Sequence, residues 1–150
     1  MENRIKFRAW NKDLKKMFQV KKLEFMGKTI IVDSEVKEKS TGKNDIESQN
    51  DIEEVELMQF TGLKDKKHKK EIYEGDIVRH QNGFLYVVEW DDINACWYLR
   101  QPRREDGNVL EGVYTGGIAG QNIWRCEVIG NIFENPELIK SARHSEHPRF

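Results

Sequence analysis

Acidic residues gather at two places in the sequence where a metal ion could be held. The first place has Glu71, Glu74 and Asp76, and the second has Asp91 and Asp92. Converging carboxylates bind divalent cations, and a metal-dependent nuclease would need several of them around its ion. The same residue types are typical of turns, in which a short Asp side chain accepts hydrogen bonds from the backbone at the entrance of a strand. We favour turns over metal sites at both places.

Histidine, cysteine and glycine residues offer no further catalytic pattern. His144 and His147 have the spacing of helical metal ligands, but no cysteine or carboxylate pair completes a site. Cys96 and Cys126 match no metal or redox spacing and are expected to be small core residues. The glycine-rich residues 116–120 lack the Lys-Ser/Thr pair of a phosphate-binding loop. The sequence therefore predicts a protein that is not an enzyme and that has no cofactor and no metal site.

Basic side chains form two groups that could contact nucleic acid or an acidic protein. The candidate contacts are Arg4, Lys6 and Arg8 near the N-terminus and Lys64, Lys66, Lys67, Lys69 and Lys70 in a lysine-rich segment. Residues 1–28 hold nine Lys/Arg and three Asp/Glu, whereas residues 33–57 hold three Lys and nine Asp/Glu. Because these two blocks of charge oppose each other, we expect any binding of nucleic acid to be weak and salt-sensitive.

The elements that position these residues are predicted to be strands. Residues 4–10 alternate between polar and apolar types, as in a half-buried strand. Asn82-Gly83 stands between two apolar runs and predicts a hairpin, and Asn135-Pro136 predicts the start of a short helix. The expected fold class is mainly β, or α+β at most. We expect a small, strongly bent antiparallel sheet or an SH3-like barrel, with N-terminal strands and a short C-terminal helix.

The 150 residues divide by composition into four parts. We expect N-terminal strands over residues 1–32, an acidic flexible loop or linker over residues 33–56, a β-rich core over residues 57–139 and a frayed tail over residues 140–150. The acidic part has too few apolar residues to offset the conformational entropy that its ordering would cost. No apolar run approaches the roughly 20 residues that span a bilayer, and the first residues have no apolar signal core. These features predict a soluble, cytoplasmic protein without membrane contact.

Four blocks of the sequence resemble YopX-family proteins. They are Phe7-Arg8-Ala9-Trp10 with Lys16-Met17, residues 57–65, residues 70–78 and residues 128–138. The resemblance implies a β-rich fold and a protein encoded by a phage or prophage of low-GC Gram-positive bacteria, located in the cytoplasm of the infected or lysogenic host. It brings no catalytic residues. The positions in these blocks that we expect to be structural are Phe7, Arg8, Ala9, Trp10, Thr61, Gly62, Leu63, Asp65, Tyr73, Gly75, Asp76, Gly130, Asn131, Asn135 and Pro136.

The lysine-rich segment departs from the family pattern. Where the family has an Asn-Gly turn, this sequence has Lys67-His68-Lys69. A two-residue primed turn needs positive φ, which lysine tolerates poorly. The hairpin here should therefore use a longer loop.

The expected role is that of a non-catalytic accessory protein that acts through protein contacts, either with itself or with a host or phage protein. The alternative is a nucleic-acid-binding module that uses the basic N-terminal strand and the lysine-rich loop. Fifteen aromatic residues are more than a small sheet readily hides, and Tyr and Trp are enriched where protein surfaces pair. We therefore expect a homo-oligomer, with the strand that carries Ile5, Phe7 and Ala9 as a candidate sheet edge.

Overall fold

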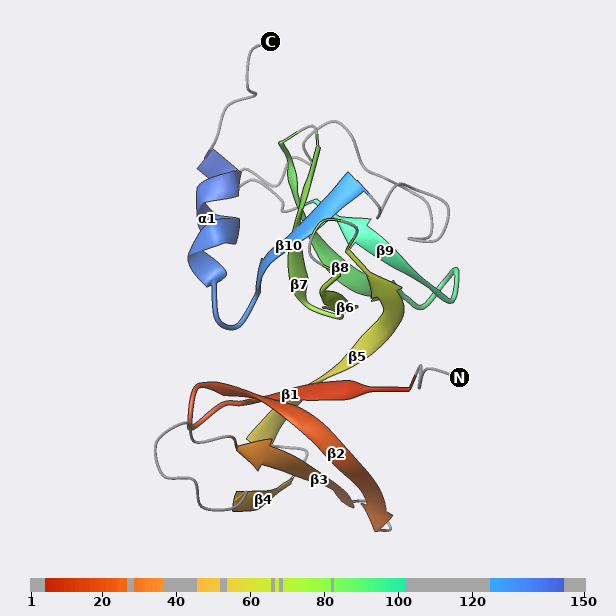
Figure 1. Cartoon of the computed structure of the whole chain (residues 1–150), viewed down its shortest axis with the longest axis vertical. Helices are drawn as coiled ribbons and strands as arrows, with labels where there is room; N and C mark the ends of the chain where they lie inside the picture. Colours follow the sequence, from red (N-terminus) through yellow and green to blue (C-terminus); the bar gives the residue numbers. More distant parts are fainter. Residues whose placement is uncertain are drawn as a thin grey trace. The chain divides into compact units, whose positions relative to one another are not determined.

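The computed structural model describes residues 5–26, 29–36, 46–51, 54–65, 67, 69–81, 83–101 and 125–144 (Figure 1). The chain forms two compact units, Met1–Phe60 and Thr61–Phe150, and the boundary falls within one strand. The elements of the first unit are β1 (Phe7–Asn11), β2 (Lys16–Met26), β3 (Thr29–Val36), β4 (Ile46–Asp51) and the first part of β5 (Val55–Lys64). The second unit has the rest of β5, then β6 (Glu71–Tyr73), β7 (Asp76–His80), β8 (Leu85–Asp91), β9 (Cys96–Arg100), β10 (Cys126–Asn131) and α1 (Pro136–His144).

β1 lies inside its sheet, which has the order β4-β3-β2-β1-β5-β6. Ala9 pairs with Phe18 of β2 on one side and with Leu57 of β5 on the other. The prediction that the strand with Ile5, Phe7 and Ala9 forms a sheet edge is therefore wrong. Alternation of residue types indicates which face of a strand is buried, but it does not indicate how many strands pair with its backbone.

Strands also occur within the acidic segment. β3 continues to Val36, β4 covers Ile46–Asp51, and the two pair antiparallel with Ser34 opposite Ser48. The prediction of a loop over residues 33–56 is wrong for these strands and for the start of β5. Strands pair through backbone hydrogen bonds, which every residue type except proline can donate, so a low apolar content does not exclude them. Residues 37–45, 52 and 53 lie outside the described residues.

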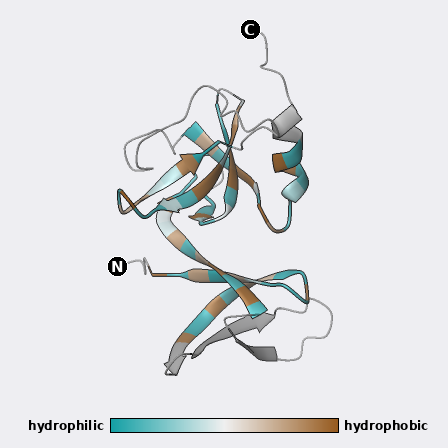
Figure 2. Cartoon of the chain, turned by 180° about the vertical axis from the view of Figure 1, so that it is seen from behind, coloured by the Kyte–Doolittle hydropathy of each residue, from teal (hydrophilic) through white to brown (hydrophobic). Residues whose placement is uncertain are grey.

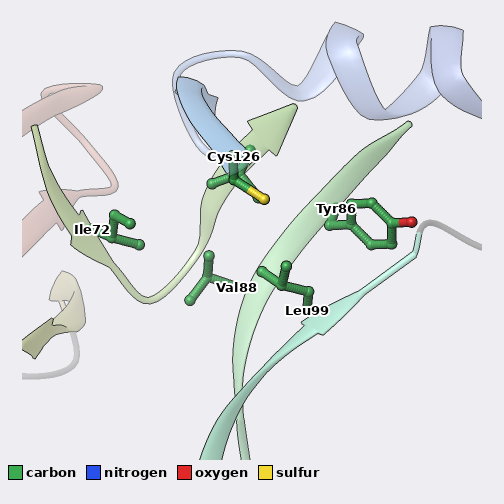
Figure 3. Close-up of a cluster of buried hydrophobic side chains, with 6 residues drawn as sticks. Ile72, Tyr86, Val88, Leu99 and Cys126 are labelled. Atoms are coloured by element: carbon green, nitrogen blue, oxygen red, sulfur yellow. The ribbon is translucent and has the colours of Figure 1, made fainter. Parts of the chain in front are cut away.

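The second unit contains an antiparallel sheet with the order β10-β7-β8-β9. The predicted hairpin between β7 and β8 is confirmed, because the two strands pair and Gly83 between them has a φ of 86°, while Asn82 lies outside the described residues. The core of the second unit is a cluster of six buried side chains (Figure 3). They are Ile72, Val78, Tyr86, Val88, Leu99 and Cys126. The mainly β class is confirmed, but the strands form two antiparallel sheets and not a closed SH3-like barrel.

Two hairpins, one in each unit, share the same turn. The first residue of each turn uses its side-chain oxygen to accept hydrogen bonds from the backbone N–H groups two and three positions later. The distances are 3.0 and 2.8 Å for Asn11, and 2.9 and 3.2 Å for Asp91. The fourth residue after it has positive φ, at 52° for Lys15 and 49° for Ala95. Short Asx side chains at the start of each turn therefore organise both hairpins.

The C-terminal helix α1 begins at Pro136 as predicted, with Glu137 in its first turn. It continues to His144, so the prediction of a frayed tail is wrong for residues 140–144, and residues 145–150 lie outside the described residues. The side-chain oxygen of Asn135 accepts a hydrogen bond from the backbone N–H of Asn131 at 3.3 Å. Within the described residues, no helix has the length and apolar character needed to cross a bilayer.

Candidate functional site

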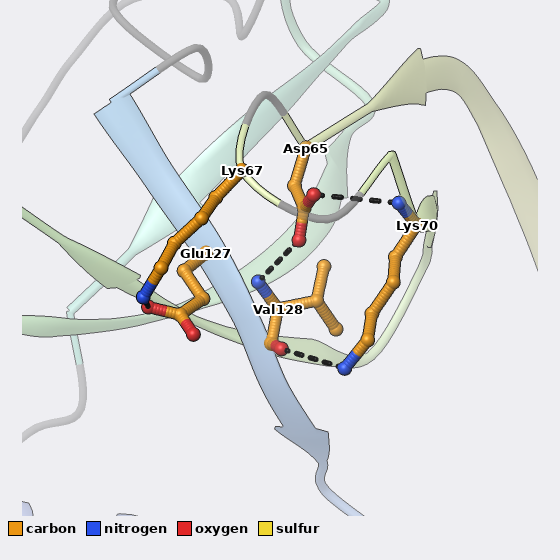
Figure 4. A network of polar contacts seen from close by, with 5 residues as sticks. All are labelled: Asp65, Lys67, Lys70, Glu127 and Val128. Atoms are coloured by element: carbon orange, nitrogen blue, oxygen red, sulfur yellow. Dashed lines mark hydrogen bonds and ion pairs between the residues drawn. The ribbon is translucent and has the colours of Figure 1, made fainter.

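The lysine-rich loop between β5 and β6 is organised by a buried carboxylate (Figure 4). Asp65 is only 1% exposed. Its two carboxylate oxygens accept hydrogen bonds from the backbone N–H groups of Lys70 (3.3 Å) and Val128 (3.1 Å). The Asp65 backbone N–H also donates to the Lys70 carbonyl at 2.8 Å, which closes the loop. The predicted longer loop is confirmed, and the same aspartate ties that loop to β10.

Two of the predicted lysine contacts lie against β10. Lys67 forms an ion pair with Glu127 at 2.9 Å, and the Lys70 Nζ donates to the Val128 carbonyl at 3.5 Å. Lys64 and Lys69 are exposed, and Lys66 lies outside the described residues.

The other predicted basic group belongs to the first unit. The Lys6 Nζ lies 5.3 Å from the centroid of the Phe60 ring, and Arg8 is half-buried in β1. Arg4 lies outside the described residues. The structure therefore places the two predicted basic groups in different units.

Both acidic clusters form turns. The Asp76 carboxylate is 1% exposed and accepts a hydrogen bond from the Tyr73 N–H at 2.8 Å, while Glu71 accepts one from the Tyr73 hydroxyl at 2.8 Å. Asp91 opens the β8–β9 turn described above and also accepts a hydrogen bond from the Asn94 side chain at 2.7 Å. At both places the carboxylates therefore accept hydrogen bonds within turns, as predicted.

Other residues of the family-like blocks also occupy turns and strand contacts. The Thr61 hydroxyl donates to the Ile72 carbonyl at 2.8 Å, and the Gly75 N–H donates to the Val88 carbonyl at 2.8 Å. Gly62 has a φ of 85° within β5, and Leu63 packs against the core cluster. In the first unit, Ala9 and Trp10 are buried and Phe7 is half-buried.

A cavity of about 490 Å³ lies where β7 ends beside the start of β10. Its wall includes Lys67, Arg79, His80, Arg125, Cys126 and Glu127. Arg79 and Arg125 were not among the residues singled out from the sequence. They come together because β7 pairs with β10 across a long stretch of chain, with Arg79 opposite Glu127. No local pattern in the sequence indicates this pairing.

Cys126 contributes a side chain to the cavity wall that is uncharged at neutral pH. Burial raises the pKa of the Cys126 thiol to about 11. The neighbouring His80 is 8% exposed, and its ring meets the Tyr86 ring edge-on with centroids 6.4 Å apart. The predicted role of Cys126 as a small core residue is confirmed, and Cys96 is half-buried.

The two thiols should differ strongly in reactivity. At pH 8 a thiol with a pKa of about 11 is ionised to about one part in a thousand, and the thiolate is the reactive form. In a Cys96→Ser variant we expect Cys126 to react with an aromatic disulfide reagent at least about tenfold more slowly than Cys96 does in a Cys126→Ala variant. Equal rates in the folded proteins would contradict this assignment, and urea should bring the two rates together.

Comparisons with known proteins place the chain in a family. A family model described as YopX protein matches residues 6–140. Among solved structures, the chain is similar to protein EF1440 from Enterococcus faecalis, with 26% sequence identity and a TM-score of 0.54. That match covers 90% of this chain and 97% of the other. No curated protein matches the sequence. Because the family model spans both units and α1 as far as Lys140, the chain belongs to the YopX family.

Proposed function

We propose that this YopX-family protein is a non-catalytic accessory protein of a phage or prophage that acts in the cytoplasm of the bacterial host through protein contacts. The first such contact is with a second copy of itself. The observation that carries this proposal is the exposed apolar end of the β8–β9 hairpin.

The end of this hairpin presents large apolar side chains to solvent. Ile93 is 93% exposed and Trp90 is 43% exposed. Trp90 meets Trp97 edge-on, with ring centroids 5.1 Å apart, and Trp97 packs against the core cluster. Figure 2 shows hydrophobic colouring in the loop that joins β8 to β9. Exposed aromatic and aliphatic side chains that continue a buried core are typical of surfaces that bind another protein.

The other face of the hairpin is held by a polar cluster. Arg100 donates two hydrogen bonds to the Glu89 carboxylate, at 2.6 and 2.5 Å, and the Tyr98 hydroxyl donates a third at 2.9 Å. Burial alone would raise the pKa of Glu89, but the bonds from Arg100 and Tyr98 outweigh it and lower that pKa. A hairpin fixed in this way loses little conformational entropy on association, which favours binding.

A second copy of the chain suits this surface because β9 is the last strand in the order of the described sheet. An end strand offers backbone groups that can pair with the same strand of another copy. A two-fold contact of this kind would pair the two strands antiparallel, place each hairpin end beside the far end of the partner strand and use each apolar side chain twice. The proposed state is therefore a symmetric dimer.

Light scattering coupled to gel filtration tests the dimer. We expect a mass of about twice the 17.7 kDa of the chain at micromolar concentration. Replacing Ile93 with aspartate should weaken the dimer about a hundredfold or more, because the change removes apolar burial and adds a charge in both copies.

The matched control is Leu14→Asp. Leu14 is 56% exposed and lies in the β1–β2 turn, which has the same geometry in the first unit. This change should leave the dimer intact. A wild-type mass of 17.7 kDa that does not change with concentration, or a dimer that survives Ile93→Asp, would contradict the proposal.

A second candidate function is the binding of nucleic acid. One observation favours it: Lys67 of the lysine-rich loop lines a cavity together with Arg79 and Arg125. Phosphate contacts made by such side chains lose affinity steeply as salt concentration rises. We therefore expect weak binding that disappears at high salt.

A further inference from the structure

The cavity at the end of β7 and the start of β10 has the dimensions of a small-ligand site. Its volume is about 490 Å³, and cavities that hold small ligands commonly measure about 300–1,000 Å³. Its wall is built from three segments that are distant in sequence: the lysine-rich loop, the end of β7 and the start of β10. Backbone bonds hold the last two together, because the Gln81 N–H donates to the Arg125 carbonyl at 3.1 Å. The wall is therefore part of the folded sheet.

The charges around the cavity are mostly positive. Three of the lining side chains are cationic, Lys67, Arg79 and Arg125, and one is anionic, Glu127. Lys67 and Glu127 form an ion pair with each other. The four charged side chains of the wall therefore sum to a net charge of +2.

Arg79 is available for an added ligand. It is exposed, and within the described part of the chain its side chain forms no hydrogen bond or ion pair. Its partner position in the β7–β10 register is Glu127, whose carboxylate is bonded to Lys67. A guanidinium group in this position can form two parallel hydrogen bonds to an oxyanion.

We propose that this cavity binds phosphate groups and that Arg79 and Arg125 hold them. Planar guanidinium groups match the oxygen geometry of a phosphate, and a surplus of two positive charges suits its negative charge. The volume also leaves room for more of the ligand than the phosphate itself. The phosphate can come from a free nucleotide or from the backbone of a nucleic acid strand. This inference rests on the second candidate function and assigns it a site.

A change at Glu127 should strengthen phosphate binding, whereas changes at the two arginines should weaken it. Its carboxylate repels a bound phosphate and occupies Lys67. Replacing Glu127 with glutamine removes that repulsion and frees the lysine, so it should strengthen binding several-fold. A variant that only disturbed the fold would not improve binding.

The experiment measures two probes at low salt with the full chain. Thymidine 3′,5′-bisphosphate is followed by calorimetry, and a short fluorescein-labelled oligothymidylate is followed by fluorescence anisotropy. Arg79→Gln and Arg125→Gln should each weaken binding about tenfold, since each removes a charge-assisted contact. Lys69→Gln is the matched control, because Lys69 is an exposed residue of the same loop that does not line the cavity. It should change binding less than about twofold, and thermal unfolding should be alike in all variants.

The two probes separate this inference from the nucleic-acid function. If the bisphosphate binds through the two arginines and the oligonucleotide does not bind, the cavity is a phosphate site and the nucleic-acid function fails. If the oligonucleotide binds equally well in both arginine variants, that function lies elsewhere on the protein and the cavity proposal is overturned. If neither probe binds to the wild-type chain, both the cavity proposal and the nucleic-acid function are overturned.

Discussion

Replacing Asp65 with alanine should lower the free energy of unfolding by about 3–5 kcal/mol. The carboxylate accepts hydrogen bonds from the N–H groups of Lys70 and Val128, and hydrogen bonds to a charged acceptor contribute about 1.5–3 kcal/mol each. Alanine removes the acceptor and leaves two N–H groups without it in a place where Asp65 is 1% exposed. The loop would also lose its connection to β10.

Urea unfolding followed by tryptophan fluorescence measures the effect. Asp65→Asn keeps one side-chain oxygen and turns the other position into a donor, so its loss of stability should be smaller than that of alanine but still large. Asp91→Ala is the matched control, since Asp91 also accepts two backbone hydrogen bonds but lies on the exposed side of a turn. If Asp65→Ala and Asp91→Ala lower the free energy of unfolding by the same amount, burial does not determine the strength of these contacts.

Local elements of this fold can be predicted from the sequence because they depend on neighbouring residues. The β7–β8 hairpin forms because Gly83 accepts a φ of 86°. The helix begins at Pro136, whose ring fixes a helical φ where no backbone donor is needed. Asp76 was expected to accept a bond from the backbone, and it does so from Tyr73.

Features that depend on long-range pairing could not be predicted in the same way. The alternation of residues around Ala9 indicates a strand. Its two neighbours, β2 and β5, depend on how all strands of the sheet pair. β3 and β4 pair through their backbones in a segment with few apolar residues, so a rule based on apolar content misses them.

The residues of the candidate site also divide into those that a local pattern indicates and those that only long-range pairing brings together. Lys67 was expected to face a partner because it belongs to a lysine-rich loop. Arg79 and Arg125 are single basic residues in their own segments, and only the pairing of β7 with β10 brings them to one cavity. A search for clusters along the sequence finds the first kind of residue and misses the second.

Gly130 should tolerate no side chain, and Gly130→Ala should cost about 1–3 kcal/mol of stability. A Cβ atom added at Gly130 would lie 2.8 Å from the Cγ atom of Asn135 and closer still to its side-chain oxygen. Asn135 cannot move away without cost, because that oxygen accepts the N–H of Asn131 at 3.3 Å where β10 leads into α1. Forcing an extra atom into a packed place shifts the backbone or the neighbouring side chain, and such overpacking usually has a cost of this size.

A double-mutant cycle separates this steric conflict from a general loss of order. Asn135→Ala alone should cost about 0.5–1.5 kcal/mol, through the lost hydrogen bond. In the Gly130→Ala background the same change also removes the obstructing atoms, so the double variant should be more stable than the sum of the two single effects predicts. Gly83→Ala is the control: a Cβ there meets open space, and its cost comes from positive φ alone, so it should simply add to that of Asn135→Ala. Additivity between Gly130→Ala and Asn135→Ala would mean that Asn135 is not what excludes a side chain from position 130.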